Sequence, residues 1–420
     1  MRIAIIGAGF TGLTAAYELL KKGHSVVVFE KDNTPGGLAI GYKEKEWDWT
    51  LEAFYHHWFT NDKAVLHLAD EIHYPVLTRL PKTSSLIDGK IYQLDSPKTF
   101  LTFPKLSFFE RLRMITTLGF LRLDPFWKPL EKVTADTWLP KAMGKKAYAL
   151  LWYPLLHNKF GNYTKDISLA WFWARIVKRT PSLSYPEGGF LRFAKALDKK
   201  VREMGGEIMY GTSVEKIEEK NGKITVGKFG IFDKAIVTLP SFIFTKLAPQ
   251  LPENYKEKLL HLKGLGAVVL VARFSQPFFT DGTYWLNVCD TSSPILAVVE
   301  HTNFMDAKKY NNEHIVYLGN YLPSNHKYFS MSEKEIMKEF DPFLEKIHPG
   351  YKKSLITVRK FSVPFAQPII PVNYSKMVPS FETPLKNVYL ANMQQVYPWD
   401  RGTNYAVQLG QKIAGIVINK

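Results

Sequence analysis

The chain has 420 residues, 46% hydrophobic and 14% aromatic, which is ample for two cores. The net charge is +16, but none of the usual nucleic-acid-binding motifs is present, so we do not expect nucleic acid as a partner. No run approaches the ~18 apolar residues of a membrane span, and no signal peptide is recognised, which predicts a cytoplasmic protein. The single cysteine, Cys289, excludes an internal disulfide and is expected to be buried and unreactive.

The first 38 residues have the pattern of a dinucleotide-binding unit. A strand at 3–6 leads through a tight turn into a helix, and the turn reads GAGFTG, with Gly7, Gly9, Phe10, Thr11 and Gly12. The three glycines permit a tight turn, close approach of the backbone to a pyrophosphate, and close packing of helix on strand. Glu30 and Lys31 follow the second strand, 25–29, and a carboxylate there can accept hydrogen bonds from a ribose. We therefore expect a dinucleotide with a free 2′-hydroxyl.

A second glycine pair, Gly36-Gly37 before Leu38, offers the backbone another close approach to a cofactor. GAGFTG, Glu30 and GGL together resemble the N-terminus of the superfamily of flavin-dependent amine oxidases, protoporphyrinogen oxidases and phytoene desaturases, although many members have arginine where Leu38 stands. The resemblance implies FAD. It also implies an α/β fold, in which a Rossmann-like FAD-binding domain of the glutathione-reductase type is joined to a discontinuous α+β substrate domain with an antiparallel sheet and a helical insertion.

Residues 42–62 form a dense cluster of aromatic and histidine residues. In the resembling superfamily the corresponding loop passes beside the flavin ring, which implies that Glu52, Tyr55, His56 and His57 wall the active site. Taken alone, the histidine pair would rather suggest ordinary packing or surface roles. Adjacent histidines point in different directions, so no metal site is expected.

The segment from Pro75 to Pro181 is predicted to be mainly helical, with helices at 108–123 and 134–156. Between Val76 and Tyr185, 18 Lys and Arg stand against 7 Asp and Glu. This excess suits a solvated basic face, an anionic membrane surface or an anionic substrate. The stretch 151–161 is too rich in large side chains for a solvent loop, so it either packs against the cofactor domain or lines a substrate cavity.

The cofactor domain is predicted to resume near Tyr185, with a helix at 191–204, strands at 207–210, 213–218 and 235–239, and a hairpin turn at Asn221-Gly222. The resemblance implies that Val214 contacts the adenine through its backbone. Strand patterns at 267–274, 295–299, 315–318 and 355–361 predict an antiparallel sheet that forms the floor of the substrate site in the family, with Arg359 and Gln367 as candidate site residues. Ser332 and Glu335 form a capping box for one helix within this region.

The end of the chain matches the closing FAD-binding segment of the superfamily, which implies roles for Asn392, Arg401, Gly402 and Thr403. We expect a strand at 388–391 and a final helix capped by Thr403 or Asn404, whose N-terminus faces the flavin. The alternative is that Asp400 and Arg401 form a surface ion pair. No cysteine or histidine lies between 392 and 420, so the FAD is expected to be non-covalent. The predicted division assigns residues 1–74, 185–250 and 375–420 to the FAD-binding domain and 75–184 and 251–374 to the substrate domain.

The leading functional hypothesis is an FAD-dependent oxidoreductase that moves a hydride from a C–N or C–C bond onto flavin N5. Its partner would be a small molecule, anionic or lipophilic, with peripheral membrane attachment at the inner face as an additional hypothesis. Two alternatives stay open. One is a flavin-dependent sugar-nucleotide isomerase resembling UDP-galactopyranose mutase, and the other is a non-catalytic flavin-binding protein. The sequence leaves the oligomeric state open.

Overall fold

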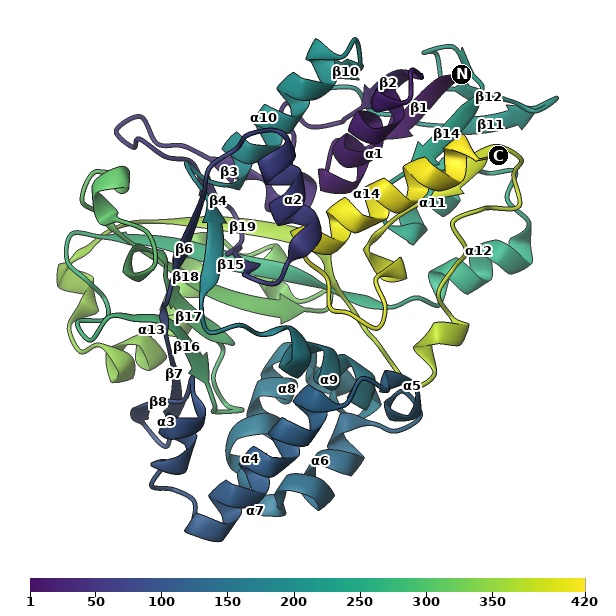
Figure 1. Ribbon diagram of the computed structural model, residues 1–420. Coiled ribbons are helices and arrows are strands. Elements are labelled where there is room, and N and C mark those ends of the chain that lie inside the picture. The colour runs from purple at the N-terminus through teal and green to yellow at the C-terminus, as the bar shows by residue number, and fades with distance from the viewer. Residues whose placement is uncertain (420) are drawn as a thin grey trace.

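The computed structural model describes residues 1–419 (Figure 1). A parallel sheet with its helices lies at the top of the view and carries both ends of the chain, a large sheet lies in the middle, and a group of helices lies at the bottom. Among the described residues, no helix is both long and apolar enough to cross a membrane.

The parallel sheet has five strands in the order β10-β2-β1-β14-β20. The strands are β1 (Arg2–Ile6), β2 (Ser25–Phe29), β10 (Glu207–Met209), β14 (Lys234–Val237) and β20 (Val388–Leu390). Each was expected from a short apolar run, because a strand buried on both faces needs apolar residues throughout. The order brings residues from the start, middle and end of the chain side by side.

Helix α1 (Phe10–Lys21) packs between α10 (Phe190–Glu203) and α14 (Thr403–Ile418). The contact with α14 depends on Gly410, because a Cβ there would lie only 2.6 Å from the carbonyl oxygen of Thr11. Two ends of the chain that are almost 400 residues apart thus share one tight interface.

The start of α14 differs from the expectation that Thr403 or Asn404 caps it. The N-cap is Gly402, which has no side chain to offer. The Oδ1 atom of Asn404 accepts instead from the backbone N–H groups of Ala64 and Val65, in the first turn of α2 (Lys63–Glu71). The prediction was wrong because the side chain of Asn404 caps α2 and not its own helix, and sequence spacing does not reveal such a contact.

The predicted hairpin at Asn221-Gly222 is confirmed. It joins β11 (Ile217–Lys220) to β12 (Lys223–Val226), and both turn residues have positive φ, 53° and 75°. With β13 (Ile231–Phe232) these strands form a small antiparallel sheet. The strand expected at 213–218 begins only at Ile217, so Val214 lies in irregular backbone between β10 and β11.

The large sheet has the order β19-β15-β18-β17-β16-β7-β8. Its pairs are antiparallel except β7 with β16. The strands are β7 (Lys82–Ile87), β8 (Lys90–Gln93), β15 (Gly264–Phe274), β16 (Thr283–Val288), β17 (Ala297–Glu300), β18 (His314–Leu322) and β19 (Leu355–Pro368). Helix α13 (Glu333–Ile347) packs on β19, and its predicted capping box between Ser332 and Glu335 is present.

The helical region begins later than predicted, since residues 76–93 form strands β6 (Val76–Arg79), β7 and β8. The single helix expected at 134–156 is also interrupted, because Gly144 has φ +96°; from Lys145 the backbone stays helical through a π-helical stretch, Tyr148–Trp152, into α8. The helices are α3 (Pro97–Leu101), α4 (Phe108–Leu123), α5 (Trp127–Leu130), α6 (Ala135–Met143), α7 (Lys145–Ala147), α8 (Tyr153–Phe160) and α9 (Leu169–Lys178). Helix α4 has the predicted bounds.

Short elements connect these parts. Strand β9 (Leu183–Pro186) pairs with β5 (Trp58–Phe59) and β6, and β3 (Gly41–Tyr42) pairs with β4 (Leu51–Glu52). Helices α11 (Ser241–Leu247) and α12 (Glu253–Leu260) follow β14. The β5-β9-β6 sheet spans the boundaries expected at 74 and 184, and we keep the two-domain division as a proposal.

Candidate functional site

The glycine turn after β1 forms a cradle of bare backbone. A Cβ on Gly12 would lie 1.9 Å from the carbonyl oxygen of Gly7, so the helix can approach the strand only with glycine here. A Cβ on Gly37 would lie 3.1 Å from the Cα atom of Gly9, and the N–H of Gly36 donates to the carbonyl of Ala8. The two glycine motifs of the sequence therefore lie against each other.

Helix α1 starts from this cradle without a side-chain cap, since its N-cap is Gly9. Its first N–H groups are thus free of a side-chain partner, and together with the helix dipole they suit a pyrophosphate. Phe10 stacks on Phe193 at 5.5 Å between ring centroids, and Thr11 is buried, so both support the cradle through packing and backbone.

Glu30, whose carboxylate was predicted to bind a ribose, lies beside the glycine turn. Its Oε2 accepts from the Ala8 N–H at 2.7 Å and its Oε1 from the Asp32 N–H at 2.9 Å, which fixes the carboxylate beside the glycine turn. Lys31 next to it is exposed. Val214 is buried near the same end of the sheet, as Thr212 donates its N–H to the carbonyl of Glu30. The glycine turn, Glu30 and the segment of Val214, which were predicted to contact the pyrophosphate, ribose and adenine, therefore lie close together.

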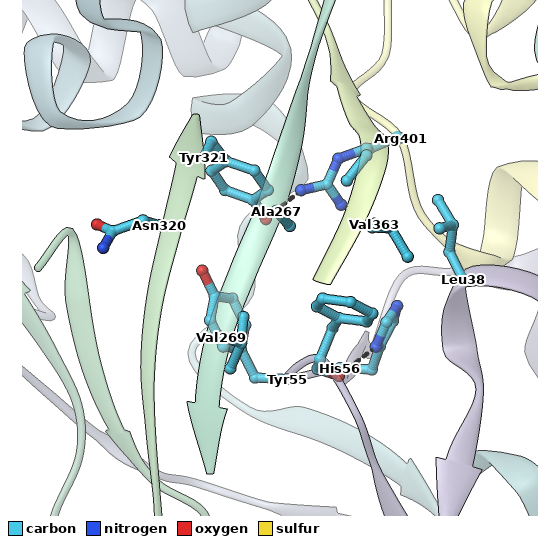
Figure 2. Close-up of a pocket in the computed structure, with 11 residues that line it drawn as sticks. Leu38, Tyr55, His56, Ala267, Val269, Asn320, Tyr321, Val363 and Arg401 are labelled. Carbon is cyan, nitrogen blue, oxygen red and sulfur yellow. Dashed lines mark hydrogen bonds between the residues drawn. The ribbon is translucent and has the colours of Figure 1, made fainter. Parts of the chain in front are cut away.

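A small cavity opens where the cradle meets the large sheet (Figure 2). It lies between the second glycine motif, the loop after β4, strands β15, β18 and β19, and the start of α14. The lining residues are Leu38, Phe54, Tyr55, His56, Ala267, Val269, Asn320, Tyr321, Val363, Ala366 and Arg401. The wall is mainly apolar with a few polar groups, as is typical of a ligand site.

The two histidines have different positions. His56 lines the cavity, and its Nδ1 lies 2.6 Å from the carbonyl oxygen of Phe54 (Figure 2). His57 lies behind it, with its Nδ1 3.2 Å from the hydroxyl of Tyr284. Burial lowers the pKa of His56 to about 4 and that of His57 to about 3, so both rings are neutral at pH 7.

Besides His57, three of the predicted catalytic residues do not reach this wall. Glu52 is buried behind it, where its carboxylate accepts from the Tyr185 hydroxyl and from the N–H of Phe190 at the start of α10. Gln367 is fully buried and its Oε1 accepts from Arg401 at 3.1 Å. Arg359 lines a separate polar hollow, where it pairs with Glu44 at 3.0 Å.

Arg401 lines the cavity and contacts the hydroxyl of Tyr321 (Figure 2). Asp400 beside it does not form the surface pair considered from the sequence, since it pairs with Arg175 at 2.5 Å and accepts from Trp171. Gly402 has extended backbone, and a Cβ there would have its nearest neighbour at 3.9 Å, so the protein itself does not demand glycine.

Two further residues that were predicted to bind the cofactor make contacts within the protein. Thr403 is the buried first residue of α14. The amide of Asn392 donates to Leu239 and Ser241 and accepts from the Gln394 N–H, which ties the end of β20 to α11. Within residues 1–419, no group of three or more His, Cys, Asp or Glu could hold a metal ion.

Sequence reasoning missed Tyr321, Asn320 and Phe54. Tyr321 and Asn320 belong to β18 and line the cavity, and nothing in the local sequence pattern distinguishes them from other strand residues. A weak signal was available in Gly319, because a Cβ at that position would lie 2.7 Å from Tyr55 Cε1. A glycine inside an apolar strand indicates the close approach of another group, here the ring of Tyr55.

Comparison with known proteins gives a family match over residues 10–418 to the flavin containing amine oxidoreductases. Curated relatives match only locally, with 69% identity over 39 residues to thiamine thiazole synthase of Thermotoga maritima and 57% over 44 residues to a 4,4′-diapophytoene desaturase of Staphylococcus aureus. These segments cover 9% and 10% of this chain, and 16% and 9% of those proteins.

Solved structures match over the whole chain. A proposed protoporphyrinogen oxidase from Exiguobacterium aligns with a TM-score of 0.77 at 17% identity, covering 100% of this chain and 99% of that one. Putrescine oxidase bound to putrescine aligns at 0.76 with 16% identity and full coverage of both chains. Reduced UDP-galactopyranose mutase aligns at 0.78 with 14% identity, covering 100% and 95%. At these identities the likeness concerns the fold.

Proposed function

The chain belongs to the flavin-containing amine oxidoreductase family and is thus an FAD-dependent oxidoreductase. We propose that it oxidises a C–N or C–C single bond of a small molecule held in the cavity of Figure 2 to a double bond: a C–H bond gives up a hydride, and the neighbouring nitrogen or carbon loses a proton. The carrying observation is that one cavity is lined both by Leu38, directly after the second glycine motif, and by Arg401, directly before the N-terminus of α14.

The residues present fit FAD. The bare backbone of Gly9 and Gly37 leaves room for a pyrophosphate, the carboxylate of Glu30 suits the ribose, and Val214 lies near the same end of the sheet. When bound, FAD supplies the hydride acceptor. This arrangement favours a FAD-binding domain of the glutathione-reductase type. We infer non-covalent attachment, since residues 392–420 contain no cysteine or histidine.

The protein would act through exclusion of water and orientation of the substrate. The apolar walls from β15 and β19 keep the cavity dry. The Nδ1 of His56 donates to Phe54, which leaves Nε2 as an acceptor for a substrate N–H or O–H. With a pKa of about 4 this ring is neutral at pH 7 and is a weak base for a second proton, so we assign it an orienting role.

The test uses three probes named by the structural relatives: putrescine, a porphyrinogen and UDP-galactopyranose. Anaerobic bleaching of the flavin absorbance by putrescine or the porphyrinogen supports the oxidoreductase. Turnover of UDP-galactopyranose only after reduction with dithionite supports the isomerase alternative. If none of the probes changes the flavin spectrum or is converted, a non-catalytic flavin-binding protein becomes the better account.

A second proposal concerns peripheral attachment to an anionic membrane. Residues 101–133 hold eight of the sixteen exposed large hydrophobic side chains found in the described part of the chain. On and beside α4 these include Phe109, 79% exposed, and Leu123, 84% exposed. Residues 98–133 also carry seven Lys and Arg against three Asp and Glu. An apolar surface surrounded by cations suits the interface of an anionic lipid layer.

A further inference from the structure

Four basic side chains lie close to one another beside the cavity: Arg401 lines it, and Lys159 contacts Tyr321, another lining residue. Lys159 comes from α8, Arg175 and Arg179 from the end of α9, and Arg401 from the loop before α14. They are near enough for the charges of the three arginines to act on the Lys159 ammonium. Asp400 is the carboxylate that meets them, through its 2.5 Å pair with Arg175.

The remaining three cations have no carboxylate within ion-pair distance among the described residues. The Lys159 ammonium contacts aromatic rings, 4.8 Å from the centroid of Tyr321 and 5.4 Å from that of Trp171. The Arg401 guanidinium has the neutral partners Tyr321 and Gln367. Cation–π contacts offset only part of the loss of water around these groups.

Arg179 connects this cluster to solvent. Its side chain is exposed, yet surrounding protein, followed by the charge of Arg175, lowers its pKa to about 10. Its positive charge also helps to lower the pKa of His57, after burial of that ring. Because the charge of Arg179 acts on His57 as well as on Lys159, this side chain lies near the wall that holds Tyr55 and His56.

The plain alternative is that these cations stabilise a helix C-terminus. Arg175 and Arg179 do lie at the C-terminal end of α9, where positive charge is favourable. This account does not extend to Lys159 and Arg401, which belong to other elements. Like charges in a partly desolvated site repel one another, and burial, with Arg175 as the next cause, lowers the pKa of Lys159 well below its usual value. An anion would reverse that effect.

We propose that Lys159, Arg179 and Arg401 bind the acidic group, a carboxylate or phosphate, of a substrate whose apolar body lies along the cavity wall. The apolar part would lie against Leu38, Val269 and Ala366. This inference rests on the proposed function, because it names the class of molecule presented to the flavin. A dication such as putrescine is repelled by the same cluster.

Binding of small aromatic probes to the FAD-loaded protein tests the proposal without requiring turnover. Benzoate and phenyl phosphate carry the acidic group, and benzamide is the neutral analogue of benzoate. Isothermal titration and perturbation of the flavin spectrum should show benzoate or phenyl phosphate binding about tenfold or more tightly than benzamide. Whichever of benzoate and phenyl phosphate binds more tightly indicates whether the acidic group of the substrate is a carboxylate or a phosphate.

Lys159→Met and Arg179→Gln should each weaken anion binding by about tenfold and leave benzamide unchanged. Lys159→Arg and Arg179→Lys should keep the preference for anions, and Lys165→Met, an exposed lysine of the same helical region, serves as the control. Equal binding of benzoate, phenyl phosphate and benzamide to the unaltered protein, or no binding at all, overturns the proposal. So does an unchanged anion preference in both charge-removing variants. Bleaching by an amine with no anion preference would leave the oxidoreductase standing and remove only this inference.

Discussion

Asp400 and Arg401 are adjacent in the chain, but their side chains have different partners. Burial alone would raise the pKa of Asp400, but Lys159, Arg175 and Arg401 hold it well below its usual value, so the carboxylate stays ionised. Arg401 lies on the cavity side, where Gln367 and Tyr321 hold it. The carboxylate of Asp400 therefore contacts α9, whereas the guanidinium of Arg401 lines the cavity.

Arg401→Ala should lower the midpoint potential of the bound flavin. Reduced flavin is anionic, and a nearby guanidinium stabilises that form more than the oxidised one. Arg359→Ala is the matched control, because Arg359 faces a different hollow and pairs with Glu44. Spectroelectrochemical titration of both variants measures the effect. An unchanged potential in Arg401→Ala would show that Arg401 does not face the flavin.

Glu52 predicts a pH dependence of stability. Burial raises its pKa from 4.5 to about 7. The native protein thus holds the proton more tightly than the unfolded chain, so this contribution is fully present below pH 4.5 and is lost as the pH rises through 7. Relative to Glu52→Gln, the wild type should lose up to about 3 kcal/mol of unfolding free energy between pH 5 and 8.

Denaturant unfolding of both proteins across this pH range measures the difference. Glu300, which has a similarly raised pKa, is present in both and cancels. A gap between the two proteins that stays constant from pH 5 to 8 would mean that Glu52 is ionised throughout.

The cofactor cradle could be predicted residue by residue, whereas the cavity wall could not. Gly7, Gly9 and Gly12 act within one turn, so their spacing is visible in the sequence. Tyr321 and Lys159 meet Arg401 only through contacts between distant segments. Arg359 and Gln367 were named because they are polar residues on a predicted strand, but the first faces another hollow and the second lies behind Arg401.

At the scale of elements, the interface between α1 and α14 gives a paired prediction. Gly410→Ala places a methyl group 2.6 Å from backbone of α1, so it should destabilise the protein by about 1–3 kcal/mol. Gly415→Ala, in the same helix with nothing within 4 Å, should stabilise it by about 0.5–1 kcal/mol. Thermal unfolding of the two variants checks this. Equal effects would mean that α14 does not pack closely on α1.

Helix α4 gives the membrane prediction. The protein should sediment with vesicles that contain phosphatidylglycerol at low salt and be released at high salt. Phe109→Asp with Leu123→Asp should weaken this binding by about tenfold or more, because two large apolar groups no longer enter the interface. Ile231→Asp with Leu260→Asp, two exposed apolar residues elsewhere, is the control. Equal binding to vesicles with and without phosphatidylglycerol would contradict the proposed attachment to an anionic membrane.

Elements with a strong local pattern were predictable, and those defined by a partner were not. Residues 108–123 have a capping box at Ser107 and helical spacing, and the helix has these bounds. Residues 76–93 looked helical, but β7 pairs with β16 almost 200 residues later, and this pairing decides their structure. Neither spacing nor propensity contains that information.

At the scale of the whole molecule, acid precipitation should release the FAD into the supernatant. The candidates for covalent attachment are His56 and His57, and His57 does not line the cavity. The single cysteine, Cys289, is buried, and burial raises its thiol pKa to about 12. His56 lines the cavity, but Phe54 occupies its Nδ1. Absorbance of the supernatant and mass of the precipitated chain measure the release. Flavin retained on the denatured protein would contradict the prediction.

The order of strands in the parallel sheet constrains when the protein can take up its cofactor. The ribosome synthesises the glycine cradle before residues 388–418, yet these later residues supply β20, which pairs with β14, and α14, which packs on α1. During synthesis the apolar face of α1 therefore stays uncovered until residues 388–418 have also left the ribosome. FAD uptake is then expected to follow translation, and the nascent chain is a natural client for chaperones.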